Sequence, residues 1–129
     1  MAEYMGKSEH QKKRAYSPAV ITQGGKTIWL AGQTATQDEQ GNDISGNFEA
    51  QVNTIFASID TTLRKAGSSL ADMVTMTVFI TDPRNHPRMT AIRREILGKD
   101  FPASASIAIS HLASPNALLE IQGVAVVTA

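Results

Sequence analysis

The sequence predicts an α+β fold in which two helices cover one face of a mixed β-sheet, in the order β-β-α-β-α-β-β. Three observations carry this prediction. Residues 47–66 repeat apolar side chains at three- and four-residue steps, which gives the apolar stripe of a packed helix. In residues 73–81, aliphatic side chains at every second position alternate with side chains that are mostly threonine, which is typical of a β-strand. Asp82 and Pro83 then provide the N-cap and the first position of a second helix, which Gly98 ends.

The other elements flank this centre. Residues 19–22 and 27–31 are expected to form strands, and the Gly24-Gly25 pair between them predicts a hairpin. Residues 36–46 are polar and contain glycine, which indicates a surface loop. Two final strands are expected at 103–109 and 117–127. Residues 1–15 are predicted to be a flexible N-terminal segment, and residues 16–129 a single domain.

The composition excludes several classes of protein. Of the 129 residues, 42% are hydrophobic, which is enough for one core. No apolar run approaches the roughly 20 residues of a membrane-spanning helix, so no membrane partner is expected. Residues 1–14 lack the apolar segment of a secretory signal. Cysteine is absent, which excludes disulfides and thiolate catalysis and is compatible with a reducing compartment. We therefore expect a cytoplasmic protein.

Charge and histidine spacing argue against nucleic-acid binding and against metal binding. The net charge is zero, and the only basic run is residues 12–14, which we interpret as part of a solvated tail. The histidines fit no zinc motif; they are His10, His86 and His111. No metal is expected.

Both faces of the predicted sheet carry apolar side chains. Trp29 opposes Ile28 and Leu30 within one strand, and the last strand has the same pattern. Two helices cover only one face, and no further segment is left to cover the other. We therefore expect a homo-oligomer that buries the second face between subunits.

Two features point to possible chemistry. Glu120 lies within an otherwise apolar strand, where a carboxylate is costly to bury unless something pairs with it. It is either directed toward a cleft, where it would polarise a water, or capped by a structural partner.

The second feature is the basic second helix. Met89, Ile92 and Ile96 are expected on its buried side. Its arginines fit a solvated face or, for one of them, a contact with a ligand; they are Arg84, Arg88, Arg93 and Arg94.

The order of elements and five segments together resemble the RidA (YjgF-type) family over residues 15–127; the segments are Tyr16-Ser17-Pro18-Ala19-Val20, Leu30-Ala31-Gly32-Gln33, Ala66-Gly67-Ser68-Ser69-Leu70, Thr77-Val78-Phe79-Ile80-Thr81-Asp82 and Phe101-Pro102-Ala103. The resemblance implies a chorismate-mutase-like subunit and a homotrimer whose sheets form a central barrel, with ligand clefts between subunits. It also implies hydrolysis of enamines and imines such as 2-aminoacrylate to 2-keto acids and ammonia, without a cofactor. Related members are linked to ribonuclease activity and translation inhibition.

Several positions match the residues that the family uses. Tyr16 corresponds to a tyrosine that lines the cleft, and Gly32 to a glycine whose backbone amide faces the ligand. Glu120 corresponds to the acidic residue that positions the attacking water. The backbone near Gly32 and at Ser104–Ala105 would stabilise developing negative charge.

Other positions depart from the family pattern. Ser104 stands where active deaminases carry an arginine that holds the substrate carboxylate, Ala31 replaces a serine, and Thr90 replaces an asparagine. Without the two-pronged guanidinium, binding of a small 2-imino acid should weaken by roughly one to two orders of magnitude. We hypothesise that Arg93 reaches the cleft and supplies the missing cation.

These observations leave three functions open. The first is a diverged hydrolytic deaminase of small enamine or imine metabolites, whose activity on 2-aminoacrylate is weak or absent. The second is a trimer that binds a small carboxylate or imine in the same clefts without catalysis. A ribonuclease is the third, and the absence of net positive charge argues against it.

Overall fold

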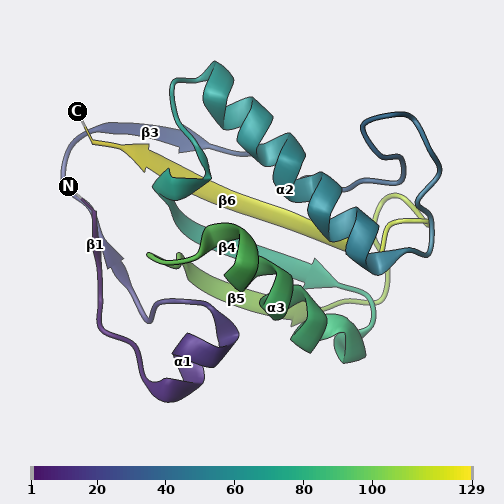
Figure 1. The fold of residues 1–129 in the computed structure, drawn as a ribbon, viewed down its shortest axis with the longest axis horizontal. Helices are drawn as coiled ribbons and strands as arrows, with labels where there is room; N and C mark the ends of the chain where they lie inside the picture. The colour runs from purple at the N-terminus through teal and green to yellow at the C-terminus, as the bar shows by residue number, and fades with distance from the viewer. Residues whose placement is uncertain (1, 129) are drawn as a thin grey trace.

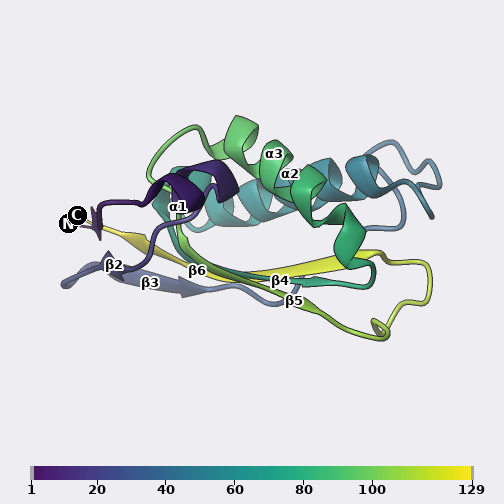
Figure 2. The same cartoon turned by 90° about the horizontal axis from the view of Figure 1, so that it is seen from below.

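The computed structural model describes residues 2–128, which form a helical layer packed on one face of a sheet (Figure 1). Four strands lie side by side in the spatial order β3 (Lys26–Trp29), β6 (Leu119–Val127), β4 (Met73–Ile80) and β5 (Ala103–Ala108). The helices α2 (Phe48–Lys65) and α3 (His86–Leu97) lie on the same side of this sheet (Figure 2). The predicted α+β class and mixed sheet are confirmed.

The register of the strands assigns side chains to the two faces. β4 pairs in parallel with β5, with Met76 opposite Ser104, and antiparallel with β6, with Phe79 opposite Glu120. Met76 is fully buried in the core beneath the helices. Paired residues share a face and successive residues alternate, so Ser104 points toward the helical layer and Glu120 toward the open face.

Helix α2 contributes more residues to the core than any other element of residues 2–128. Asn47 caps its first turn by accepting a hydrogen bond from the backbone amide of Ala50 at 3.1 Å. Its buried stripe is apolar except for Gln51, whose side chain donates to the carbonyls of Ile44 and Asn116 and accepts from the amide of Leu118 at 2.8 Å. The side-chain amide of Gln51 therefore ties α2 to the segment that enters β6.

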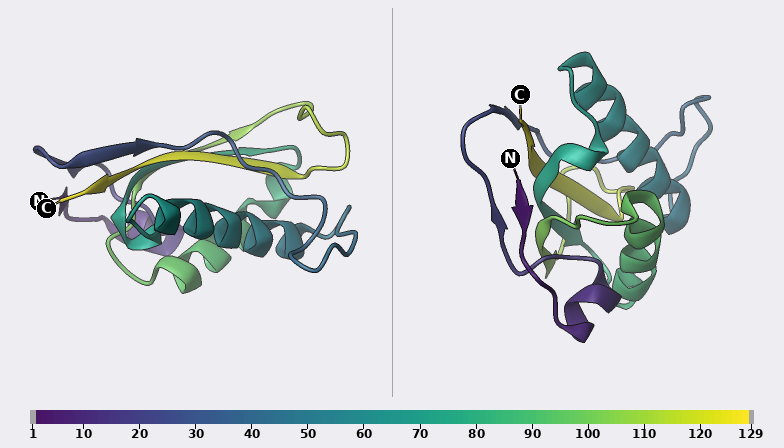
Figure 3. Two further views of the ribbon diagram at one scale, coloured as in Figure 1. Left: turned by 90° about the horizontal axis from the view of Figure 1, so that it is seen from above. Right: turned by 60° about the vertical axis from the view of Figure 1, so that its left-hand side comes forward.

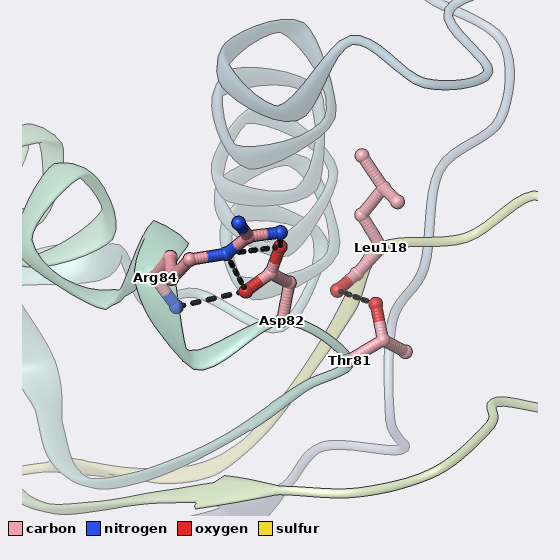
Figure 4. A network of polar contacts seen from close by, with 4 residues as sticks. All are labelled: Thr81, Asp82, Arg84 and Leu118. Atoms are coloured by element: carbon pink, nitrogen blue, oxygen red, sulfur yellow. Dashed lines mark hydrogen bonds and ion pairs between the residues drawn. The ribbon is translucent and has the colours of Figure 1, made fainter.

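Asp82 acts as an N-cap as predicted, but it caps a 3₁₀ turn, and α3 itself begins only at His86. The Asp82 carboxylate accepts hydrogen bonds from the backbone amide and from the guanidinium of Arg84, while Thr81 donates to the carbonyl of Leu118 at 3.3 Å (Figure 4). A 3₁₀ turn (Pro83–Asn85) precedes the helix. The prediction that Ile96 lies on its buried side is wrong, because Ile96 is 36% exposed and Arg93 is buried instead.

The N-terminal segment contains two short elements that the sequence analysis did not assign, β1 (Glu3–Tyr4) and α1 (Glu9–Arg14), whereas β2 (Val20–Ile21) lies within the strand predicted at residues 19–22. A capping box between Ser8 and Gln11 starts α1, and this pair is the local signal that was overlooked. Arg93 and Arg94 donate to backbone carbonyls at the end of α1, at 2.8 and 3.0 Å, so α1 packs beside α3 (Figure 3). The flexibility predicted for residues 1–15 stays a prediction.

The predicted hairpin between residues 19–22 and 27–31 is wrong. β2 pairs with β1, whereas β3 pairs with β6. Gly24 and Gly25 do form a turn, with φ angles of 67° and 82°. A Cβ at Gly25 would lie 2.5 Å from the carbonyl oxygen of Val127, so the chain leaves this turn against the backbone of β6 rather than against β2.

The face of the sheet opposite the helices carries exposed apolar groups. Trp29 is 80% exposed and Ile107 43% exposed. No helix of residues 2–128 covers this face (Figures 2 and 3). Within the same residues, no helix is both long enough and apolar enough to span a membrane.

Candidate functional site

A polar cavity of about 200 Å³ lies where α1, α3 and β5 meet. No acidic side chain lines it; its residues are His10, Arg14, Tyr16, His86, Arg93, Ser104 and Ser106. Three of them, Tyr16, Arg93 and Ser104, were candidates from the sequence. The cavity is therefore a small electropositive hollow.

Arg93 forms the inner wall of this cavity and is only 1% exposed. Its Nη1 donates to Ser104 Oγ at 2.7 Å, and its Nη2 donates to the backbone carbonyl of Arg14 at 2.8 Å. Its Nε is buried and makes no hydrogen bond to any residue of the described chain. Burial, and then the positive charge of Arg14, lower the pKa of Arg93 to about 10. The guanidinium is thus buried, cationic and without a carboxylate partner among residues 2–128.

Backbone pairing brings the other polar groups to Arg93. Ser17 bridges to Ala103 in parallel, its amide donates to the carbonyl of Pro102 at 3.1 Å, and its hydroxyl donates to the carbonyl of Phe101. This pairing holds the neighbouring Tyr16 beside the start of β5, where Ser104 faces the helices. The cluster therefore depends on contacts between segments that are far apart in the sequence.

His86 lies at the start of α3, at the junction with a second cavity. Its Nδ1 is buried and has no hydrogen-bond partner within residues 2–128. Burial, Arg14 and Arg93 together lower its pKa, so the imidazole is neutral at pH 7. The second cavity, of about 230 Å³, shares Arg14, His86 and Ser106 with the first and is otherwise apolar; it adds Ile80, Pro83 and Ala108.

Glu120 and Gly32 form a separate pair on the open face of the sheet. A Cβ added at Gly32 would overlap the carboxylate of Glu120, so this glycine is what lets the carboxylate lie against the backbone. The Glu120 carboxylate is partly exposed and makes no ion pair within residues 2–128. It is therefore not capped by a structural cation of this part of the chain.

The structure thus divides the predicted site residues between the two faces of the sheet. Ser104 and Arg93 lie on the helical side, whereas Glu120 lies on the open face. Ala105, which follows Ser104 and pairs with Thr77, is exposed on the open face.

The remaining two predicted residues lie elsewhere. Ala31 is exposed beside Gly32. Thr90 is buried and lines neither cavity, because its hydroxyl donates to the carbonyl of Pro87 at 2.9 Å within α3.

Sequence reasoning missed Arg14 and His10 as cavity residues. Arg14 was interpreted as part of a solvated tail with Lys12 and Lys13, but it is half-buried while the two lysines are exposed. No local pattern distinguishes these three cations; only the position of α1 against α3 does. Within residues 2–128 no three His, Asp or Glu side chains gather as a metal site would require.

Comparison with known proteins identifies the family. The model of the family described as Endoribonuclease L-PSP matches residues 7–127. A RutC family protein of Pyrococcus abyssi is 30% identical over 110 residues, which cover 85% of this chain and 84% of that protein. The 2-iminobutanoate/2-iminopropanoate deaminase of Dermatophagoides farinae is 25% identical over 112 residues, covering 87% of this chain and 85% of that protein.

Solved structures agree with this result. A protein of unknown function of the conserved Rid family, YyfB from Yersinia pestis, superposes with a TM-score of 0.86 at 25% identity, covering 98% of both chains. A putative endoribonuclease from Thermotoga maritima has a TM-score of 0.72 at 29% identity, covering 88% of this chain and 87% of that one. The chain therefore belongs to the Endoribonuclease L-PSP family, whose members are also described as YjgF/RidA-type proteins.

Proposed function

We propose that this protein is a homotrimeric hydrolase that converts small 2-imino or enamine acids to 2-keto acids and ammonia, and that Arg93 holds the substrate carboxylate. The contact between Arg93 and Ser104 carries this proposal. Ser104 stands where the resemblance implies an arginine, and a guanidinium from α3 lies 2.7 Å from its hydroxyl. In this proposal Arg93 on α3 supplies the positive charge that the family's arginine would supply from β5 at the position of Ser104.

The unpaired donors of Arg93 suit a carboxylate. The Nε–H has no partner within residues 2–128, and hydrogen bonds to a charged group contribute roughly 1.5–3 kcal/mol each. A carboxylate that accepts from this atom would also neutralise the buried charge. Ser104 would orient the guanidinium or donate its own hydroxyl hydrogen to the ligand.

Glu120 is the group that we assign to the chemical step. As a water attacks the imine carbon, the carboxylate takes one proton from that water and a C–O bond forms. Return of this proton to nitrogen gives a carbinolamine. Glu120 then moves the hydroxyl proton to the amino nitrogen, so that the C–N bond breaks as the C=O bond forms, and ammonia leaves with a 2-keto acid as the second product. The sum is one imine and one water giving one ketone and one ammonia, without any redox change.

Catalysis in this scheme requires a second copy of the chain. Arg93 and Glu120 lie on opposite faces of the sheet, so one small substrate does not reach both within one chain. The exposed Trp29 and Ile107 give the open face an apolar surface on which a neighbouring subunit would pack. We propose that Glu120 of one subunit completes the cleft formed at Arg93 of another.

The test generates 2-aminoacrylate and 2-iminobutanoate in situ and follows ammonia release. Glu120→Gln should lower the rate by about 10²–10⁴-fold, the usual contribution of a general base. Gly32→Ala should have a similar effect, because the three atoms nearest to its Cβ all belong to the side chain of Glu120, which it would displace. Glu39→Gln, an exposed residue of the loop before α2, is the matched control and should leave the rate unchanged. Full activity of Glu120→Gln would refute the mechanism.

Binding without catalysis is the second candidate. The separation of Glu120 from Arg93 within one chain favours it. It predicts that the wild type binds small carboxylates and that Arg93→Met abolishes binding, while no imine is hydrolysed faster than in buffer. Ammonia release by the wild type, lost in Glu120→Gln, would exclude this alternative.

A further inference from the structure

We propose that the cavity at Arg93 binds a small dicarboxylic acid, with Arg93 contacting one carboxylate and Arg14 contacting the other. This inference rests on the anion-binding role of Arg93 in the proposed function and extends it to the class of ligand. It makes Arg14, at the end of α1, the residue that sets specificity.

The charges around the cavity carry the argument. Arg93 and Arg14 both line it, and neither forms an ion pair with an acidic residue of the described chain. The adjoining cavity, which Arg14 also lines, contains no carboxylate among its residues either. The two guanidiniums repel each other, which is one cause of the lowered pKa of Arg93. One negative charge would leave this repulsion half compensated, whereas two would remove it.

His86 does not supply a third charge. Its pKa is lowered by burial and by the same two arginines, so it is neutral at pH 7. His86 lines both cavities, and its buried Nδ1 has no partner within residues 2–128. The imidazole is placed to exchange a hydrogen bond with an oxygen of the ligand. At neutral pH the cavity lining therefore carries the two positive charges of Arg14 and Arg93, which a dianion would balance.

The dimensions limit the size of the ligand. A cavity of about 200 Å³ corresponds to the volume of about seven water molecules in the liquid. This space accepts a chain of about four to six carbon atoms, and the apolar walls of the second cavity at Ile80, Pro83 and Ala108 suit its methylene groups. A nucleotide is too large for it.

Calorimetric titration of the full chain with succinate and with butanoate provides the test. These acids have four carbons each and differ by one carboxylate. At pH 7.5 and constant ionic strength, we expect succinate to bind at least tenfold more tightly than butanoate. Arg14→Gln should reduce the affinity for succinate to that for butanoate and leave the affinity for butanoate within twofold of the wild type.

Two further variants control for charge and for folding. Lys13→Gln removes the same charge from the adjacent, exposed position and should keep the preference for succinate. Arg14→Lys keeps the cation and should retain at least part of the preference, which separates loss of charge from a failure of α1 to fold. Equal affinities for both acids in the wild type, no binding of either, or an equal loss of both in Arg14→Gln would overturn the inference.

The outcome is distinguishable from that of the proposed function. A preference for succinate that Arg14→Gln removes, in a protein that hydrolyses no imine, supports the dicarboxylate site and rejects the deaminase. Hydrolysis of 2-iminobutanoate without binding of succinate supports the deaminase and overturns the dicarboxylate site.

Discussion

Replacing Arg93 by methionine should leave the protein folded while abolishing anion binding. A side chain that is 1% exposed ordinarily costs several kcal/mol when it is changed. Arg93 differs because its charge is itself unfavourable in the empty cavity. Methionine has a similar length, carries no charge and fills the same space beside the sulfur of Met76.

The magnitude follows from the pKa of Arg93. Lowering this pKa from its usual value to about 10 means that the charged form is disfavoured in the folded state by roughly 3 kcal/mol. Methionine removes this cost, but it leaves Ser104 Oγ and the carbonyl of Arg14 without their donor, at about 1–3 kcal/mol for each group that finds no water. The two contributions largely offset each other, so the free energy of unfolding should fall by at most about 3 kcal/mol.

Urea denaturation at one fixed protein concentration measures this change. Ile92→Ala, a truncation in the core under the same helix, provides the scale and should cost about 2–5 kcal/mol. Succinate at 100 times its Kd should stabilise the wild type by about 2.7 kcal/mol and Arg93→Met not at all. A loss above about 4 kcal/mol in Arg93→Met would refute the reasoning, because it would mean that a carboxylate from another subunit already neutralises the guanidinium.

Three further predictions concern other parts of the molecule. Gln51→Leu should lower the free energy of unfolding by about 3 kcal/mol or more, since three backbone groups lose their buried partner. The control Gln23→Leu, at an exposed position, should leave the free energy of unfolding unchanged, and urea denaturation of both variants makes the comparison. Trp29→Glu should convert the oligomer to monomers in gel filtration, and an unchanged elution volume would contradict a role for the open face. NMR titration should give a pKa for His86 below its usual 6.5, and this pKa should rise in Arg14→Gln. Because the folded state disfavours the imidazolium, the stability linked to His86 is present above pH 6.5 and is lost as the pH falls through the lowered pKa.

The arrangement of α2, β4, α3 and β6 could be predicted because the information is local. The stripe of α2, the alternation in β4 and the Asp82 cap each lie within one element, and each appears in the structure. The pairing of β2 was not predictable in this way. A glycine pair at a turn indicates that the chain reverses direction, but it does not say which strand edge the next residues will meet. At Gly25 the close approach of β6 determines the result.

The candidate site could be predicted only in part, for a related reason. The resemblance singles out Ser104, and the absence of an arginine at this position is the basis of the hypothesis that Arg93 supplies the cation. Nothing in the run Lys12-Lys13-Arg14 marks its last member as different from the other two. That difference arises when Arg93 and Arg94 bind the carbonyls at the end of α1 and hold the helix against α3. The specificity of the cavity is thus a tertiary property.

The position that we propose for the cation, on α3 instead of β5, also affects the energetics of the site without a ligand. Within residues 2–128, Arg93 donates hydrogen bonds only to neutral acceptors, namely Ser104 Oγ, the backbone carbonyl of Arg14 and the sulfur of Met76, and none of them compensates its charge. The folded chain therefore contains a charge that burial disfavours, and this free energy is released when an anion enters. A methionine at position 93 would remove that driving force together with the contact. For this reason loss of binding without loss of the fold is the outcome that distinguishes a ligand site from a structural arginine.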